Sequence, residues 1–240
     1  MARRRDVLAG LALALAGDAA RGHAAVLQGA LPWVPESSQP PPVTRDGPWQ
    51  YFTADEAVTV EALVDRLIPP DPETPGGKEA GCAVFIDRQL AGPYGDMEGL
   101  YVAGPFLDGT KQQGPQSPVA IKDHYRAALI ALDSYCRASH GGSRFADLSD
   151  ADKDAVITGL ENGSIDLGET KGSFFTQLLK DTQQGFFADP LYGGNRGMVG
   201  WKMIGFPGAR YDYRDWVERH NEPYPGAPIG IVDHPEWKAD

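Results

Sequence analysis

The chain has 240 residues, of which 42% are hydrophobic and 23% are charged, and its formal net charge is −11 at pH 7. A chain of this length and composition can bury a sizeable core and fits one domain with extensions better than two full domains. The negative charge disfavours a nucleic-acid-binding surface, because phosphate binding requires a basic patch and no run of Lys or Arg follows the first few residues.

The N-terminus has the pattern of a signal peptide. Basic residues precede an apolar run from Val7 to Ala16 that is too short to cross a bilayer as a stable anchor, and small residues follow it up to residue 24. Arg4, Arg5 and Leu8 fit the twin-arginine type, which is read by a machinery that exports folded proteins. An ordinary secretory signal with a basic start is the alternative, and the sequence does not fix whether or where residues 1–24 are removed.

Two proline-rich arms are expected to flank the domain. Residues 25–50 favour extended backbone, because proline restricts its own φ and donates no backbone hydrogen bond. Trp33 and Trp49 are large rings that a disordered spacer rarely needs, so this arm is expected to dock on its own domain or on a partner. The tail, 221–240, is also expected to lie extended on a surface, which leaves a domain over 51–220.

Hydrophobic periodicity and capping residues predict a mainly α-helical domain with long irregular loops. The expected helices cover about 53–68, 78–90, 117–139, 149–160 and 173–187. A capping box of Thr53 and Glu56 marks the first start, and Ser117–Pro118 marks the third. Glycine, proline and aromatic residues fill 91–116, which we expect to be an irregular contact loop packed either on its own domain or on a partner. A short hairpin is expected around Trp201–Phe206.

The stretch from Gln184 to Arg210 is the least periodic part of the domain. Large apolar side chains alternate there with glycines, so the segment has no periodic face on which to bury them. The rings must therefore be held by the rest of the domain or by another protein. The residues alone leave both possibilities open, and the first hypothesis is that the stretch is a partner interface. The residues expected to form it are Phe186, Phe187, Tyr192, Asn195, Arg196, Trp201, Met203 and Phe206.

Five motifs carry a family resemblance. They are R-L-I-P-P-D at 66–71, A-G-C-A-V-F-I-D-R-Q-L at 80–90, the loops G-P-Y-G and Y-V-A-G-P-F, and the stretch 184–210. Over about 51–219 the chain resembles the small subunit of membrane-bound gluconate 2-dehydrogenase, subunit 3. The resemblance implies an accessory polypeptide that partners a large flavoprotein dehydrogenase and a multihaem cytochrome c subunit.

The resemblance also implies where the chemistry lies. FAD, with an iron–sulfur cluster in related glucose dehydrogenases, would be held by the large subunit, and haem c by the cytochrome, which passes electrons to quinone. The implied reaction is the oxidation of gluconate to 2-ketogluconate, or of a related sugar or sugar acid. The complex would face the periplasm and lie peripherally on the cytoplasmic membrane, and this chain would support folding, export and assembly of the flavoprotein.

The chain itself offers no legible catalytic, cofactor-binding or metal-binding residues. Its histidines are scattered, it has no C-x-x-C-H motif for haem, and its two cysteines cannot hold a four-thiolate iron–sulfur cluster. The acidic run from Asp150 imitates a calcium loop but has Ala155 where the sharp turn needs glycine. Cys82 and Cys136 fall on apolar helix faces, so they are expected to be buried thiols, with a disulfide as the alternative in an exported protein.

Two functions of different class remain open at this point. In the first, the chain is a subunit of an oxidoreductase complex and is not catalytic on its own. In the second, it is a free-standing exported enzyme or sugar-binding protein whose pocket is lined by the 185–210 loop. Tyr192, Asn195, Arg196 and Trp201 would then face sugar hydroxyls and a carboxylate.

Overall fold

The computed structural model describes residues 43–44, 47–100, 102–107, 109–110, 112, 117–168, 174–210 and 212–233. The expected signal peptide, with Arg4, Arg5 and Leu8, lies outside the described residues. So do Trp33 in the N-terminal arm and the last seven residues of the tail, 234–240.

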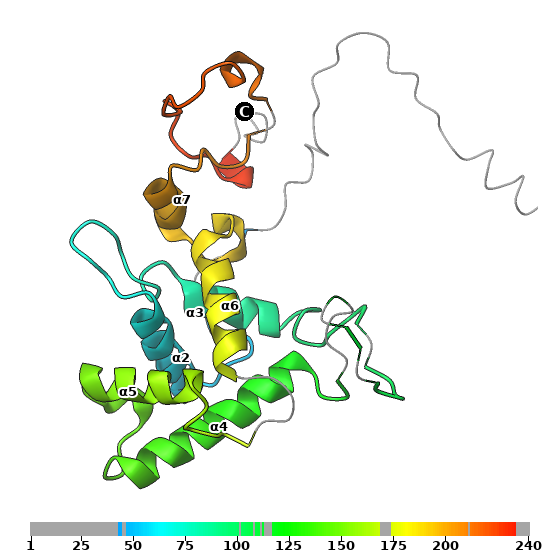
Figure 1. Cartoon of the computed structure of the whole chain (residues 1–240), viewed down its shortest axis with the longest axis vertical. Helices are drawn as coiled ribbons and strands as arrows, with labels where there is room; N and C mark the ends of the chain where they lie inside the picture. The colour runs from blue at the N-terminus through cyan, green and yellow to red at the C-terminus, as the bar shows by residue number, and fades with distance from the viewer. Residues whose placement is uncertain are drawn as a thin grey trace, which may run out of the picture. The chain divides into compact units, whose positions relative to one another are not determined.

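Six α-helices, joined by turns and irregular segments, make up the regular structure of the described residues (Figure 1). They are α2 (Ala54–Leu67), α3 (Cys82–Leu90), α4 (Ile121–Ser139), α5 (Asp150–Glu161), α6 (Phe174–Phe187) and α7 (Val199–Ile204). Short 3-10 helices are η2 (Phe145–Asp147), η3 (Pro190–Tyr192), η4 (Arg196–Met198), η5 (Arg214–Trp216) and η6 (Ile231–Asp233). The prediction of a mainly α-helical fold with irregular loops is confirmed, and no strand occurs among the described residues.

Capping side chains explain two of the predicted helix starts. Thr53 accepts the Glu56 N–H, and the Glu56 carboxylate accepts the Thr53 N–H, which completes the capping box of α2. Ser149 accepts the Asp152 N–H at the start of α5. Both interactions satisfy backbone donors that have no partner inside the helix.

Two other helices start later than predicted. The third expected helix begins at Ile121 and not at Ser117, because the Ser117 hydroxyl accepts the Val119 N–H at 3.1 Å and closes a local turn ahead of the helix. The second begins at Cys82, after Gly81, whose φ of 81° is in the left-handed region and interrupts the helical backbone.

The hairpin expected around Trp201–Phe206 is wrong, because residues 199–204 form α7. A two-residue hairpin turn would need positive φ within this segment. Positive φ occurs instead at its two ends, at Met198 (58°) and Gly205 (68°), where it starts and stops a short helix. Trp201 is thereby turned inward while Met203 and Ile204 remain exposed.

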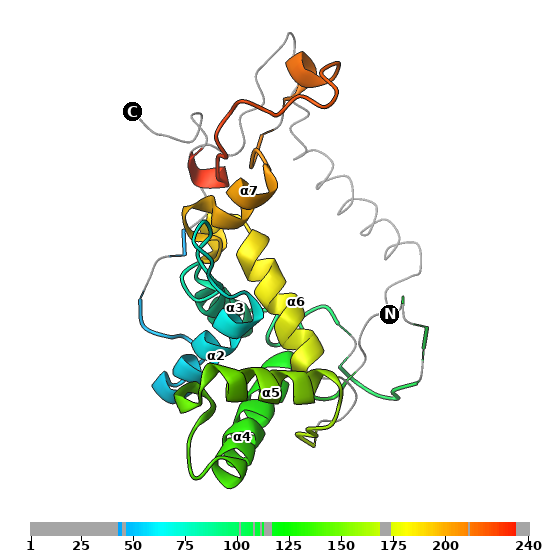
Figure 2. The ribbon, with the colours of Figure 1, turned by 60° about the vertical axis from the view of Figure 1, so that its left-hand side comes forward.

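Helix α6 is the central element of the core. It packs against α2, α3, α4, α5 and α7, and both ribbon views show it lying beside α3 (Figures 1 and 2). It contributes Phe174, Leu178 and Phe186 to the core, where the amphipathic faces of α2 and α4 also meet. The apolar stripe predicted for each of these helices is therefore the face that the fold buries.

Two buried carboxylates tie irregular segments to the helices. Asp87 on α3 accepts the backbone N–H groups of Gln50, Tyr51 and Phe52, each at 2.9 Å, and so fixes the arm where it enters α2. Asp181 on α6 accepts the hydroxyl of Tyr94 at 2.7 Å. The start of the 91–116 loop is thus packed on its own domain.

The Asp181 carboxylate also joins two helices. It accepts the hydroxyl of Tyr125 from α4 at 2.6 Å and the side-chain amide of Gln177 at 2.8 Å. Burial, together with the adjacent carboxylate, raises the pKa of Tyr125 well above its ordinary value. Tyr125 is therefore a neutral hydrogen-bond donor that fixes the position of α4 against α6.

Residues 207–210 and 212–230 form a separate excursion, here called the C-terminal loop. Its ends meet through a parallel bridge between Gly208 and Ile229. The Ala209 N–H donates to the Ile229 carbonyl at 2.7 Å, and the Ile229 N–H donates to the Pro207 carbonyl at 3.3 Å. Residues 221–230 of the expected tail therefore belong to this loop.

Candidate partner interface

The segment that follows α6 folds back against the end of this helix, and its side chains hold it there through hydrogen bonds. The indole N–H of Trp201 donates to the Phe187 carbonyl at 2.7 Å, and the amide of Asn195 donates to the Ala188 carbonyl at 2.8 Å. The Asn195 side chain also accepts the Gly200 N–H at 2.9 Å. Carbonyls at the end of a helix lack intrahelical partners, so these bonds complete α6 and fix α7 beside it.

Glycines allow the close approach that this folding back requires. A Cβ added at Gly194 would lie 2.1 Å from the Gly185 carbonyl oxygen, and one added at Gly200 would lie 2.2 Å from the Phe186 carbonyl oxygen. Both positions meet backbone, which cannot move aside as a flexible side chain could. The alternation of glycine with large residues therefore lets the end of α6, the turn after it and α7 pack tightly together. We call these three segments the framework.

Three residues of the predicted interface belong to this framework and not to the surface. Phe186, Asn195 and Trp201 are at most 5% exposed. Phe186 is part of the core, and the polar groups of Asn195 and Trp201 already bond within the chain. The assignment of these three side chains to a partner surface is corrected, because the folded chain itself covers them.

The other large apolar side chains of the stretch remain exposed. Phe187, Tyr192, Met203 and Phe206 are 38–53% exposed. Ile204, which is not part of the predicted interface, is 58% exposed. We call these five residues the α6–α7 surface. They are connected through the framework, since the Phe187 ring lies against Gly200 of α7 and Phe206 packs edge-on against Trp201 at 5.2 Å.

An open groove of about 420 Å³ adjoins this surface. It is lined by residues of α3, of the end of α6 and of the turn that follows. They are Phe85, Gln89, Gln184, Phe187, Ala188, Asp189 and Tyr192. The groove offers aromatic walls with two side-chain amides, which suits a polypeptide segment of a partner.

The four residues considered for a sugar pocket are not brought together. Of these, Tyr192 alone lines the groove, while Asn195 and Trp201 are buried. Arg196 is half-buried, donates its backbone N–H to the Ala80 carbonyl at 3.0 Å, and places its side chain against Gly81. The described geometry therefore provides no convergent set of these polar groups.

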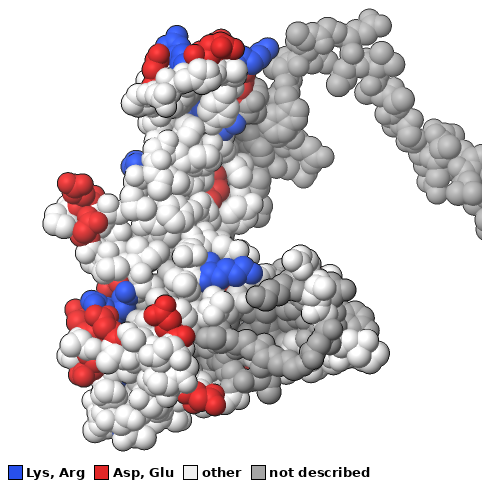
Figure 3. Space-filling view, viewed as in Figure 1, with Lys and Arg blue, Asp and Glu red and all other residues white. Residues whose placement is uncertain are grey.

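Charge is distributed unevenly around the candidate interface. On the face drawn in Figure 3, Lys, Arg, Asp and Glu gather over α2 and α5 and over the C-terminal loop. Few charged atoms lie over α7 and the adjoining end of α6. Depletion of charge around exposed aromatic and Met side chains is typical of the centre of a protein–protein interface.

The acidic run that resembles a calcium loop has another role. Asp150 and Asp154 form ion pairs with Arg66 of α2, and Asp152 bonds to Ser149. The Arg66 guanidinium holds the pKa of Asp154 below its ordinary value. Within the part of the chain that the structure describes, no group of three or more His, Cys, Asp or Glu is placed to hold a metal ion.

Both cysteines are buried free thiols, so the disulfide alternative is not formed in the structure. Burial raises the pKa of Cys82 to about 12 and that of Cys136 to about 11. Thiolate is the reactive form of cysteine, so neither side chain is expected to react readily at neutral pH.

Taken with the fold, these features define a small helical domain with an exposed apolar surface on a rigid framework. The sequence profile of gluconate 2-dehydrogenase subunit 3 matches residues 54–208, more than half of the chain. The chain belongs to this family, as its motifs indicate. Comparison with curated proteins and with solved structures gives no match.

The family match places the chain among subunits of an oxidoreductase complex. The matched residues include all of the α6–α7 surface and the groove beside it. In the described ranges of the chain, none of the helices combines the length and the apolar composition needed to span a bilayer.

Proposed function

We propose that this chain is the non-catalytic small subunit of a membrane-associated, FAD-dependent gluconate 2-dehydrogenase complex. It supports the folding, twin-arginine export and assembly of the flavoprotein subunit. The observation that carries the proposal is the α6–α7 surface. Within a family of complex subunits, the chain keeps five large apolar side chains exposed on a framework that is otherwise closely packed.

The physical argument concerns the energy of that surface. Exposed aromatic and aliphatic side chains gain about 25 cal/mol for each Å² of apolar area removed from water. Because the framework fixes α7 against α6, a partner that covers this surface orders little additional backbone. Affinity therefore depends on a few anchors, for which Phe187, Tyr192 and Phe206 are the best placed.

The division of labour in the proposed complex follows the family resemblance. The large partner holds FAD, with or without an iron–sulfur cluster, and oxidises gluconate to 2-ketogluconate. A cytochrome c subunit with several haems passes the electrons to quinone. The complex faces the periplasm, and this chain reaches the membrane through its partners.

Replacement of exposed side chains tests the proposal. The full chain is co-expressed with the flavoprotein subunit, and co-purification is measured for Phe187→Ser, Tyr192→Ser and Phe206→Ser. Each variant is expected to lose most of the complex while changing the free energy of unfolding of the isolated chain by no more than about 1 kcal/mol, because these side chains are partly exposed.

A matched control distinguishes loss of the proposed interface from the loss of any exposed apolar side chain. Ile130 on α4 is 61% exposed and lies outside the α6–α7 surface, so Ile130→Ser is expected to leave assembly unchanged. Complex yields that fall equally for Ile130→Ser and Phe206→Ser would contradict the assignment of the interface. A purified chain that binds or oxidises gluconate without a partner would instead support the free-standing alternative.

A further inference from the structure

The two ends of the described chain meet at the turn that follows α6. At the N-terminal end, the Thr44 N–H donates to the Leu191 carbonyl at 2.8 Å. At the C-terminal end, the Ile231 N–H donates to the Asp189 carboxylate at 2.7 Å. The two acceptors are two residues apart, so Thr44 and Ile231 both lie beside this turn.

Asp189 is the residue that joins the C-terminal end to the turn. Its side chain is buried, and one carboxylate oxygen accepts the Leu191 N–H at 2.9 Å, which caps the 3-10 helix η3. The other oxygen accepts the Ile231 N–H, 42 residues away in the sequence. Both bonds are charge-assisted, which makes them stronger than bonds between neutral groups. Asp189 also lines the groove beside Tyr192.

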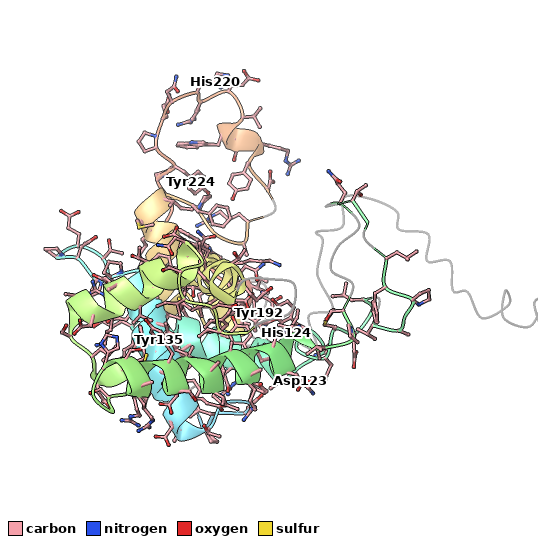
Figure 4. All side chains as sticks on the ribbon, turned by 60° about the horizontal axis from the view of Figure 1, so that its bottom comes forward. Asp123, His124, Tyr135, Tyr192, His220 and Tyr224 are labelled. Carbon is pink, nitrogen blue, oxygen red and sulfur yellow. The ribbon has the colours of Figure 1, made fainter. Side chains whose placement is uncertain are left out.

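The C-terminal loop that Asp189 fastens is packed by its own side chains. The rings of Trp216 and Tyr213 lie edge-on to the Tyr224 ring, with centroid distances of 5.4 and 5.8 Å. The Arg210 guanidinium carbon lies 5.3 Å from the centroid of the Tyr224 ring. Figure 4 shows Tyr224 near the base of the loop and His220 at its far end.

The loop is also continuous with the α6–α7 surface. It starts at Pro207, directly after Phe206, and it exposes a further large apolar side chain, Val217, at 61%. A loop held at its base by a backbone bridge and by Asp189 needs little ordering when a partner binds, which lowers the entropic cost of association.

We propose that the C-terminal loop and the α6–α7 surface form one composite interface for the flavoprotein subunit, with Asp189 as the positioning residue. This inference rests on the proposed function. The occupant is the same partner for both parts, because the loop continues directly from Phe206 and because Asp189, which fastens its end, also lines the groove beside the α6–α7 surface. Asp189 positions the loop through the backbone at Ile231; because its carboxylate also lines the groove, a variant at Ile231 isolates this effect from direct contact with the partner.

Asp189→Asn in the full chain tests the inference, because asparagine has one acceptor oxygen for two N–H donors. The expected result is amide exchange at Ile231 that is about tenfold faster in the isolated chain, and affinity for the flavoprotein subunit that is about tenfold weaker. The unfolding midpoint of the helices should change little. Asp147→Asn is the matched control, since Asp147 is an exposed carboxylate paired with Arg144, and it should change neither quantity.

Each outcome bears on the inference. Faster exchange at Ile231 with unchanged affinity would overturn the composite interface and leave the proposed function intact. Wild-type chain that fails to bind the flavoprotein subunit would overturn both. If Asp189→Asn does not fold, Ile231→Pro removes the donor and leaves the carboxylate in place, and it is expected to weaken affinity to the same degree. Undiminished affinity in a folded Ile231→Pro chain would also overturn the composite interface.

Discussion

Trp201 and Phe206 touch each other but are expected to respond oppositely to truncation. Trp201 is 5% exposed, and its indole N–H is bonded to the Phe187 carbonyl. Replacing a buried tryptophan by alanine costs about 3–5 kcal/mol through lost burial and the resulting cavity. The unpaired carbonyl of Phe187 adds roughly 1 kcal/mol. Against a total stability of about 5–15 kcal/mol, Trp201→Ala should therefore remove a large part of the stability of the chain.

Phe206 is 43% exposed, so Phe206→Ala should change the free energy of unfolding by no more than about 1 kcal/mol. Its effect should appear in affinity for the flavoprotein subunit, as a loss of about tenfold. Urea unfolding of the isolated variants, followed by circular dichroism, separates the two cases. An unchanged unfolding midpoint for Trp201→Ala, or a large loss of stability for Phe206→Ala, would refute the division between framework and surface.

Three further predictions concern the arm, the export signal and the thiols. Asp87→Ala should lower the free energy of unfolding by about 3–5 kcal/mol, because it removes a buried charge that accepts three backbone N–H groups; an unchanged urea midpoint would contradict this. Replacing Arg4 and Arg5 by lysine should leave the flavoprotein subunit in the cytoplasm, as measured by cell fractionation, and its normal export would refute a carrier role. Cys82 and Cys136 should resist alkylation at pH 8 in the native chain, because both thiols are buried and have raised pKa values. Both should react once the chain is unfolded in guanidinium without reductant. An unfolded chain with no reactive thiol would show that the two cysteines form a disulfide.

The helices could be predicted because their signals are local. The capping box of Thr53 and Glu56 and the cap at Ser149 each involve residues three apart, and both helices begin where these side chains indicate. The start of α4 could not be predicted from Ser117–Pro118, because the same hydroxyl can close a short turn ahead of a helix as readily as cap one.

The candidate site was predictable in position but not in detail. Glycines and large apolar residues identified the stretch, but without a period the sequence cannot separate side chains that face inward, such as Trp201, from those that face outward, such as Met203. The anchoring carboxylates were missed for a different reason. Asp87 and Asp189 bond to backbone 35–42 residues away, and no local pattern encodes such partners.

The central claim is that this chain works by assembling with a catalytic partner through the surface between α6 and α7. The most direct measurement is the mass, by light scattering, of the wild-type chain mixed with the separately purified flavoprotein subunit, compared with a chain carrying Phe187→Ser and Phe206→Ser together. The account predicts a stable complex for the wild type and two separate species for the double variant. A complex of equal mass and affinity with both chains would contradict it.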